Sequence, residues 1–357
     1  MRCLGSPLLA TAIWCGCLGL LSCQRSTPED KITQPSPDVH SEAQVEARQA
    51  DIQAEQAEQS QLQFQQAVEK QDLARLEKWL KSGADPSLVD ANGNTPLTLA
   101  AGAGWKEAVI FLLDQGARLD QEAPLENQSA LAWALAHHWQ GLTGRLLTAG
   151  ALPDQALLTP ADESFISKVN APAFAYYLRK EKGVTPLMLA AATGQDEALL
   201  TLLEAGADRR AKTHKHQTTA IWLAGRGHHV RSMQILLGLK EDKAPSARIE
   251  VSLKKQSLAL LKNEEVIFQS PISSGAKGYE TPPGKYVVTN KHREWFSTLY
   301  DDAPMPFFLR LSCGAIGFHA GNLPGYPASH GCIRLPYENA KALFGRVNVG
   351  TEVVIHP

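Results

Sequence analysis

The chain has 357 residues, of which 44% are hydrophobic, and its formal net charge at pH 7 is -2. This length predicts two or three structural units, and the apolar content is enough to give them cores. A nearly neutral chain without a dominant basic region gives no reason to expect a nucleic-acid-binding protein.

The N-terminus is predicted to be an export signal. Arg2 supplies one positive charge, and the apolar run from Leu8 to Leu21 is short for a membrane span. The run ends in Leu20-Leu21-Ser22-Cys23, which resembles a lipobox, where a signal peptidase cuts before a cysteine that becomes lipidated. We therefore expect residues 1–22 to be removed and Cys23 to carry a lipid. An ordinary signal peptide and an uncleaved anchor are the alternatives.

The position after the lipid-bearing cysteine bears on localisation. Gln24 rather than Asp stands there, which is compatible with outer-membrane sorting by resemblance to enterobacterial rules. We expect a membrane-anchored lipoprotein in the periplasm of the cell envelope.

The six cysteines lie near the two ends of the chain. A long cysteine-free stretch separates the two groups, so they do not form a disulfide framework. Cys313 and Cys332 could pair, but a cysteine that acts as a nucleophile has to stay reduced. The six are Cys3, Cys15, Cys17, Cys23, Cys313 and Cys332.

Residues 23–62 are predicted to be a tether. Prolines among polar residues between 24 and 40 indicate a flexible linker. Residues 41–62 are rich in Gln, Glu and Ala, which favour a helix, but they lack an apolar stripe. A solvated helix and a further stretch of spacer both fit this pattern.

A repeat follows over residues 63–243. Gly-Ala pairs recur in steps of 33, 34 and 56 residues, and a second motif that starts with Thr or Ser recurs in steps of 34, 56 and 34. The 22 extra residues in one step predict an insertion near residues 159–181. The pairs start at Gly83, Gly116, Gly150 and Gly206, and the second motif starts at Thr95, Ser129, Thr185 and Thr219.

These repeats resemble ankyrin repeats. Thr95-Pro96-Leu97 and Thr185-Pro186-Leu187 match the start of the family's first helix, where Thr caps the helix and Pro fits its first turn. The family's following His is replaced by Thr98 and Met188. We expect about four and a half stacked repeats, because one repeat alone cannot bury its apolar face. The apolar runs Val109–Leu113 and Leu199–Leu203 are expected in second helices.

The resemblance implies a protein partner on the concave face of the array, and a spacer or packing platform for the rest of the chain is the alternative. The insertion is apolar enough at Ser164–Ile166 and Tyr176–Leu178 to pack or to bind. Four histidines of this region are interpreted as surface residues of the repeats: His214, His216, His228 and His229.

Residues 247–357 show short alternating and β-branched runs, which predict a mostly-β domain with one helix. The fold class is therefore multidomain α+β, an α-solenoid followed by a β-rich unit. We expect strands at Ile249–Leu253, Ser257–Leu261, Val266–Phe268, Tyr286–Thr289, Phe307–Leu311, Ala315–Phe318 and Thr351–Ile355, a turn at Thr281–Gly284, and a helix at Pro336–Phe344 that Gly345 ends.

Four residues of this domain invite chemistry: His319, Ser329, His330 and Cys332. A thiol is a poor nucleophile until it ionises, and a nearby imidazole can take its proton. Gly331 permits a tight turn in which backbone N–H groups can converge as an oxyanion hole. The alternatives are an inert buried cysteine, a merely structural His319, and a zinc site formed by His319, His330 and Cys332.

The domain resembles the catalytic domain of YkuD-type L,D-transpeptidases. The residues that carry the resemblance are His319 and the run Ser329-His330-Gly331-Cys332-Ile333-Arg334-Leu335. Supporting stretches are Ser273–Gly275, Thr281–Tyr286 and Met305–Phe308.

The resemblance implies that Cys332 attacks a peptidoglycan stem tetrapeptide, releases D-alanine and forms a thioester. An amine of a second stem peptide would then resolve the thioester into a 3-3 crosslink, without a cofactor. His319 would be the proton acceptor and donor, oriented by the Ala320 carbonyl. The backbone amides of His330, Gly331 and Cys332 would form the oxyanion hole. Ser329 and Arg334 would fix the loop or bind a substrate carboxylate, with a structural ion pair as the alternative for Arg334.

Two features depart from the family pattern. Only nine residues separate His319 from Ser329, which makes the intervening loop short, and Arg334 stands where Asn is usual. There is no accessory peptidoglycan-binding repeat, so the array is expected to take that place or to recruit a protein acceptor. The alternatives to a transpeptidase are a hydrolase that uses the same acyl-enzyme and a non-catalytic ankyrin adaptor at the cell wall.

Overall fold

The structure is a computed structural model that describes residues 38–357, except Ala91, 120–127, 241–244, 299–301, Cys313 and Ala315. The expected export signal over residues 1–22, the lipidation site Cys23 and the tether up to residue 37 lie outside the described residues. Within the described range, no helix is both long and apolar enough to cross a membrane.

Helix α1 (Asp38–Lys70) occupies the second part of the expected tether. Its side chains from residue 44 to 59 are exposed, so a solvated helix is the alternative observed there. The helix continues past residue 62 into the repeat region, where Phe64 becomes buried against Trp79 with ring centroids 5.0 Å apart. Ser60 accepts a 2.9 Å hydrogen bond from the Trp79 indole. The last turns of α1 therefore pack on α2 (Leu73–Lys81).

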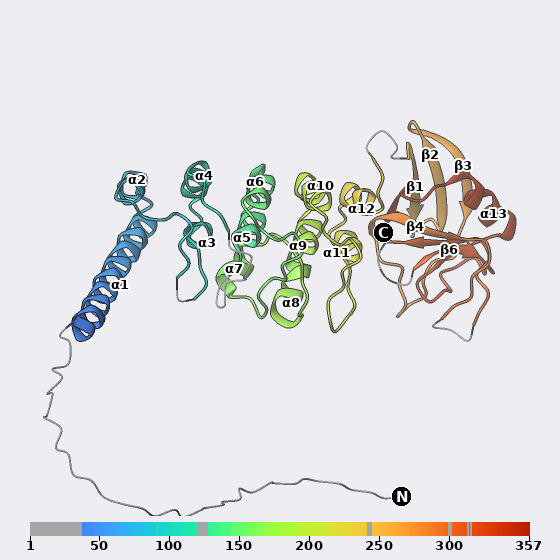
Figure 1. Ribbon diagram of the computed structural model, residues 1–357. Coiled ribbons are helices and arrows are strands. Elements are labelled where there is room, and N and C mark those ends of the chain that lie inside the picture. The colour runs from blue at the N-terminus through green and yellow to red at the C-terminus, as the bar shows by residue number, and fades with distance from the viewer. Residues whose placement is uncertain are drawn as a thin grey trace, which may run out of the picture. The chain divides into compact units, whose positions relative to one another are not determined.

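The repeat region consists of paired short helices whose first members contact one another in sequence, as do the second members (Figure 1). The expected caps are present: Thr95 and Thr185 accept hydrogen bonds from the backbone N–H groups of Thr98 and Met188, at 3.2 and 3.3 Å. The pairs are α3 (Pro96–Gly102) with α4 (Lys106–Asp114), α5 (Ala130–Ala136) with α6 (Leu142–Thr148), α9 (Pro186–Thr193) with α10 (Asp196–Glu204), and α11 (Ala220–Arg226) with α12 (Val230–Leu236).

The insertion forms two further helices, α7 (Glu163–Lys168) and α8 (Pro172–Lys180). Phe165 and Phe174 are buried in the core of the array, whereas Tyr176 is 46% exposed. The insertion therefore mainly packs, and it leaves one aromatic ring on the surface.

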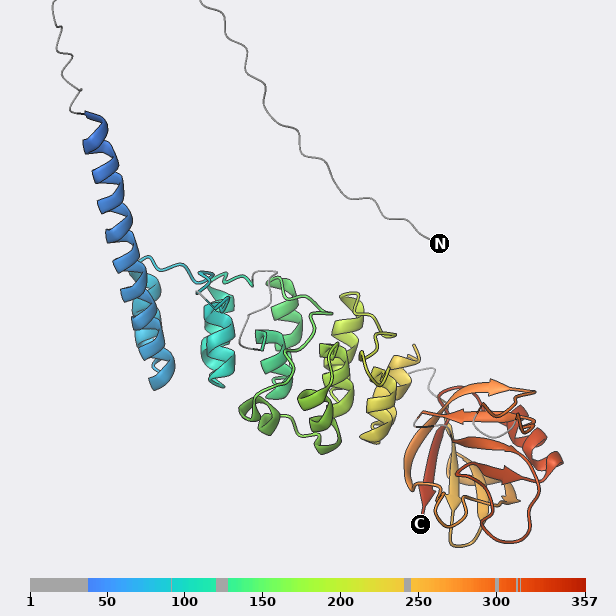
Figure 2. The same cartoon turned by 90° about the horizontal axis from the view of Figure 1, so that it is seen from below.

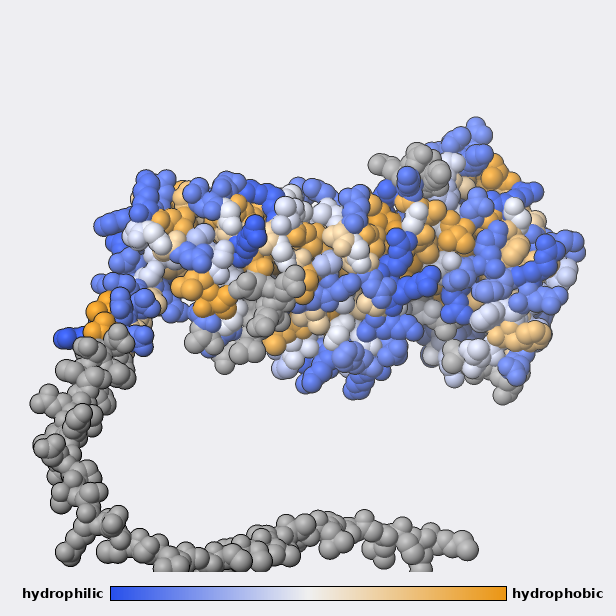
Figure 3. Space-filling view, in the orientation of Figure 1, coloured by the Kyte–Doolittle hydropathy of each residue, from blue (hydrophilic) through white to orange (hydrophobic). Residues whose placement is uncertain are grey.

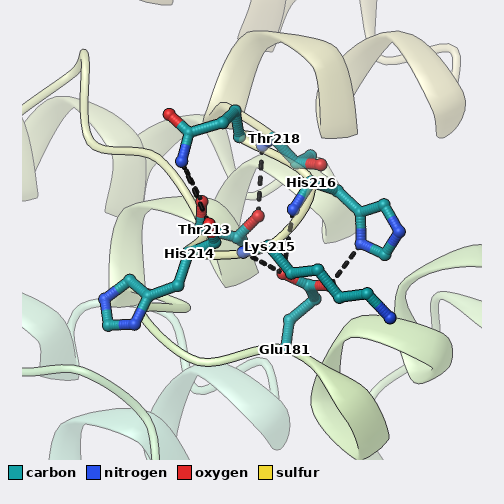
Figure 4. A network of polar contacts seen from close by, with 7 residues as sticks. Glu181, Thr213, His214, Lys215, His216 and Thr218 are labelled. Atoms are coloured by element: carbon teal, nitrogen blue, oxygen red, sulfur yellow. Dashed lines mark hydrogen bonds and ion pairs between the residues drawn. The ribbon is translucent and has the colours of Figure 1, made fainter.

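A buried carboxylate ties the end of the insertion to the loop of the next repeat (Figure 4). Glu181 is fully buried, accepts hydrogen bonds from the backbone N–H groups of Lys215 (3.2 Å) and His216 (3.4 Å), and contacts the His216 ring nitrogen. Burial raises the pKa of Glu181, but the hydrogen bonds from His216, Lys215 and Thr213 outweigh it and lower the pKa overall. The carboxylate is therefore held in its charged form.

The C-terminal domain is a curved eight-stranded sheet with α13 against it (Figure 2). The strand order is β3-β2-β1-β8-β4-β5-β6-β7, and only β1–β8 and β6–β7 are parallel pairs. The strands are β1 (Ala247–Ser252), β2 (Ser257–Lys262), β3 (Glu265–Pro271), β4 (Gly284–His292), β5 (Phe308–Leu311), β6 (Gly317–Ala320), β7 (Ile333–Leu335) and β8 (Glu352–His356), and α13 spans Tyr337–Arg346.

Three expectations for this domain need correction. Strand β6 begins two residues later than expected, which places His319 inside the strand. The three-residue strand β7 was not expected, because its pairing with β6 leaves no periodic signal in so short a run. Helix α13 runs through Gly345 to Arg346, so that glycine does not end it. A helical glycine costs only about 1 kcal/mol relative to alanine, and burial of Leu343 and Val347 on either side favours continuation.

Candidate active site

The two residues expected to carry the chemistry come from neighbouring parallel strands. In the register of β6 and β7, Phe318 is paired with Ile333, and His319 with Arg334. Cys332 immediately precedes β7 and therefore lies beside Gly317, whose backbone hydrogen-bonds it. His319 is 8% exposed, and Cys332 is half-buried.

The orientation of the His319 ring is fixed by the backbone. Its Nδ1 lies 2.8 Å from the carbonyl oxygen of Ala320. A carbonyl can only accept a hydrogen bond, so Nδ1 carries the proton and Nε2 of the neutral ring is the acceptor. The expected contact with Ala320 is confirmed.

The environment keeps both side chains neutral at rest. Burial lowers the pKa of His319, and the positive charge of Arg334 lowers it further, against the opposing hydrogen bond to Ala320. Burial raises the pKa of the Cys332 thiol, while the Gly317 N–H and the charges of Arg334 and Arg310 partly offset it. A protonated thiol therefore lies beside an unprotonated imidazole, the pairing that general-base activation of a cysteine requires.

Residues 329–332, here called the nucleophile loop, are held by the side chain of Ser329. This residue is 2% exposed, and its hydroxyl donates to the carbonyl of Cys332 and accepts a 3.1 Å hydrogen bond from the Gly331 N–H. Gly331 adopts φ +108°, a region that favours glycine. Ser329 thus fixes the loop from inside. The Gly331 N–H is used within the loop, which corrects its expected place in an oxyanion hole.

A segment some 50 residues earlier supports the nucleophile loop from outside. Ser273 and Arg334 exchange two backbone hydrogen bonds of 3.0 and 2.9 Å, and Ser329 donates its N–H to the Ser274 carbonyl at 3.0 Å. The Thr281 hydroxyl donates to the Gly331 carbonyl at 2.8 Å and accepts from the Gly275 N–H at 2.9 Å. The stretches at 273–275 and 281 therefore act together, although they lie on no regular strand with the loop.

His330 lies apart from this buried arrangement. It is exposed, and its ring packs edge-on against Tyr279 with centroids 4.6 Å apart. This position supports His319, rather than the adjacent His330, as the residue beside the thiol.

Arg334 places a positive charge at the site without a carboxylate partner among the described residues. Its side-chain stem packs on the backbone of Gly321, where a Cβ atom would lie 3.0 Å from the Arg334 Cδ. The structural ion pair considered from the sequence is therefore not observed. Nor do three or more His, Cys, Asp or Glu side chains of the described part converge as metal ligands.

Comparisons with known proteins assign the two regions. A family model described as the L,D-transpeptidase catalytic domain matches residues 246–355, and ankyrin-repeat models match residues 64–153, in three copies, and 182–214. The YkuD protein of Bacillus licheniformis, whose name assigns it to the L,D-transpeptidases, is 30% identical over 132 residues, covering 34% of this chain and 73% of that protein. The chain belongs to the L,D-transpeptidase family.

Other relatives share the same domain. YciB of Bacillus subtilis is 30% identical over 124 residues, which cover 30% of this chain and 64% of that protein. Among solved structures, an L,D-transpeptidase from Mycobacterium smegmatis aligns at 20% identity with a TM-score of 0.30, over 31% of this chain. The match spans 59% of the mycobacterial chain, less than two-thirds of its length.

Sequence reasoning missed one charged residue near the nucleophile of this L,D-transpeptidase domain. Arg310 lies in β5, lowers the pKa of Cys332 and stacks over the rings of Trp295 and Phe308, at 5.4 and 5.7 Å from their centroids. The available signal was a lone arginine inside the apolar run 307–311.

Proposed function

We propose that the C-terminal domain is a cysteine-dependent L,D-transpeptidase that acts on peptidoglycan stem tetrapeptides through a thioester on Cys332. The observation that carries the proposal is the hydrogen bond from His319 Nδ1 to the Ala320 carbonyl. It leaves Nε2 as the proton acceptor, on the strand next to the one that follows Cys332. The membership of the family supports the choice of substrate class.

The first half of the reaction forms the acyl-enzyme. The Cys332 thiol gives its proton to His319 Nε2, and the sulfur attacks the carbonyl carbon at the L-centre of the diamino acid. The tetrahedral intermediate collapses as the C–N bond to D-alanine breaks, and His319 returns the proton to the leaving amine. The products are free D-alanine and a thioester between the tripeptide and Cys332.

The second half regenerates the thiol. An amine of a second stem peptide attacks the thioester carbonyl, His319 accepts the amine proton, and the Cys332 sulfur leaves and is reprotonated. Backbone N–H groups around Cys332 are proposed to stabilise the negative oxygen in both halves, with Ser329 holding the loop that presents them. Arg334 supports the reaction because its charge lowers the pKa of both His319 and Cys332.

The nature of the acceptor decides between transferase and hydrolase. The test is a digest of purified tetrapeptide muropeptides with the wild-type chain and with Cys332→Ala. Crosslinked dimers that need Cys332 are the expected result. Tripeptides alone would identify a hydrolase, and no Cys332-dependent product would contradict both activities.

The array is proposed to bind a protein partner. Ankyrin repeats suggest protein interaction, and this array exposes large apolar side chains, among them Leu88 (50%) and Leu200 (43%). On the face in Figure 3, apolar residues are interspersed with polar ones along the array. A purely adaptor role would leave the cell-wall phenotype intact in Cys332→Ala, whereas the transpeptidase proposal requires its loss.

A lipid on Cys23 is proposed to hold the enzyme in the cell envelope, where its substrate class lies. Labelling cells with a fatty-acid analogue should mark the wild-type protein and leave Cys23→Ala unmarked. Equal labelling of the two proteins would contradict this anchor.

A further inference from the structure

The last ankyrin repeat, residues 219–239, is in direct contact with the sheet domain. Residues 57–357 form one compact unit, and both α11 and α12 contact β4. Val287 of β4 is fully buried and belongs to the core of the array, whereas its neighbours Tyr286 and Val288 belong to the core of the sheet. Because alternate residues of a strand point to opposite faces, β4 lies between the two cores.

A buried hydrogen bond adds to this contact. Gln234 of α12 is 7% exposed, and its Nε2 donates to the carbonyl of Gly350 at 3.0 Å. Leu239 packs on the same glycine, since a Cβ at residue 350 would lie 2.0 Å from the Leu239 Cδ1. Gly350 in turn donates its N–H to the Val288 carbonyl at 2.7 Å. The repeat thus holds β4 and the turn before β8 together.

His228 reaches the beginning of β4. Its Nδ1 lies 3.2 Å from the backbone nitrogen and 3.3 Å from the carbonyl oxygen of Lys285. The ring also covers Gly284, where a Cβ would lie 2.2 Å from the His228 Cε1. Although exposed, His228 is therefore more than the surface residue of a repeat that the sequence suggested.

The backbone of His228 makes this contact more informative. It adopts φ +60°, in the left-handed region. The equivalent positions of other repeats, spaced by the same steps of 34, 56 and 34 residues, are Gly104 (+73°), His138 (+55°) and Gly194 (+71°). Glycine adopts this conformation freely and histidine does not. A histidine at residue 228 is therefore retained against the local backbone preference, and it is the one that contacts the sheet.

The segment between Lys285 and Thr281 connects this contact to the nucleophile. The Tyr286 hydroxyl donates to the Pro282 carbonyl at 3.0 Å and closes the turn. Thr281, 2% exposed, donates to the carbonyl of Gly331 in the nucleophile loop. The contacts therefore form a continuous series from His228 through Lys285 and Thr281 to the residue beside Cys332.

We propose that the last ankyrin repeat is a positioning element of the transpeptidase site, in which His228 and Gln234 fix the start of β4 and, through Thr281, the nucleophile loop. The proposal rests on the proposed function, because its consequence is the reactivity of Cys332. The array then completes the enzyme, in addition to any partner it binds.

The test compares His228→Gly with His138→Gly in the full chain, because the two histidines occupy equivalent positions. Glycine relieves the left-handed backbone in both, so neither variant should lower the thermal midpoint. The rate of Cys332 acylation by a carbapenem, followed by intact mass, should fall roughly tenfold in His228→Gly and stay unchanged in His138→Gly. His228→Asn, which tolerates the backbone and keeps a polar group, should recover most of the rate.

Two further measurements make the outcome decisive. If His228 acts through Thr281, the double variant with Thr281→Val should react no more slowly than Thr281→Val alone. The rate of Cys332 alkylation by iodoacetamide across pH, measured on the same variants, does not depend on transpeptidase activity. Unreactivity of the wild type toward the carbapenem would count against the proposed function, and the alkylation rates would still decide the positioning role. Equal rates in His228→Gly, His138→Gly and wild type would overturn it.

Discussion

The array and the sheet domain are stabilised by contacts of different range. In the array, each helix packs mainly on its partner and on the helices of the next repeat, as α3 does on α4 and α5. In the sheet domain, the nucleophile loop depends on partners far away in sequence, such as Thr281, which is 50 residues from Gly331. A lost contact in the array should therefore weaken stability locally, while a lost contact in the sheet domain should reach the chemistry directly.

The largest expected effect lies at the pair His319 and Cys332. Removal of either side chain should reduce transpeptidation at least about a thousandfold, the scale found when one member of a nucleophile–base unit is removed. In His319→Ala the residual alkylation of Cys332 should rise steeply with pH, because the thiol then has to ionise without a base. Muropeptide turnover and alkylation rates measure the two effects. A His319→Ala variant with a wild-type pH profile would exclude His319 as the base.

Thr281→Val should break the sheet domain's long-range support. The substitution leaves the Gly275 N–H and the Gly331 carbonyl without their buried partner, which costs roughly 1–3 kcal/mol. Urea denaturation should show this loss, and the acylation rate should fall with it. Thr281→Ser keeps the hydroxyl and serves as the control. Equal stability of the two variants would show that the hydroxyl is dispensable.

Glu181→Gln tests the opposite side of the comparison. The substitution removes a fully buried charge that accepts hydrogen bonds from Lys215 and His216, and it should destabilise the chain by roughly 1–3 kcal/mol. Acylation of Cys332 should keep its wild-type rate. Glu163→Gln, at an exposed ion pair with Arg179, is the matched control and should cost less than about 1 kcal/mol. A slower acylation in Glu181→Gln would contradict the local character of array contacts.

The same carboxylate predicts a pH dependence of stability. The pKa of Glu181 is lowered in the fold, so its contribution is complete above the ordinary glutamate range and is lost as the pH falls through the folded value. Wild type and Glu181→Gln should therefore converge in thermal midpoint at acidic pH. A constant difference between them across pH would contradict the charged state of Glu181.

The difference in contact range also explains how far the sequence could be interpreted. Repeat spacing predicted the helix pairs, because each pair carries its own cap and apolar face. The sequence also identified His319 and Cys332 and the contact with Ala320, because these depend on residues close in the chain. The engaged Gly331 N–H, the position of Arg310 and the contact of His228 with Lys285 were missed. Each of these follows from strand pairing or packing between distant residues, which has no local signal.

Arg334→Asn should produce the smallest effect. Removing the guanidinium lets the pKa of both His319 and Cys332 rise, because its charge lowers both. The acid limb of the acylation profile should therefore move to higher pH, with a change in rate near neutrality of less than about tenfold. The rate measured from pH 5 to 8 gives the shift. A shift of the acid limb to lower pH would contradict the assigned role of the charge.

The most direct measurement is the intact mass of the full chain after incubation with a carbapenem, for wild type and for Cys332→Ala. A single adduct on the wild type, located at Cys332 by peptide mapping and absent from Cys332→Ala, is the predicted result. A folded wild-type protein that gains no adduct, or an adduct that persists in Cys332→Ala, would contradict the assignment of Cys332 as the nucleophile.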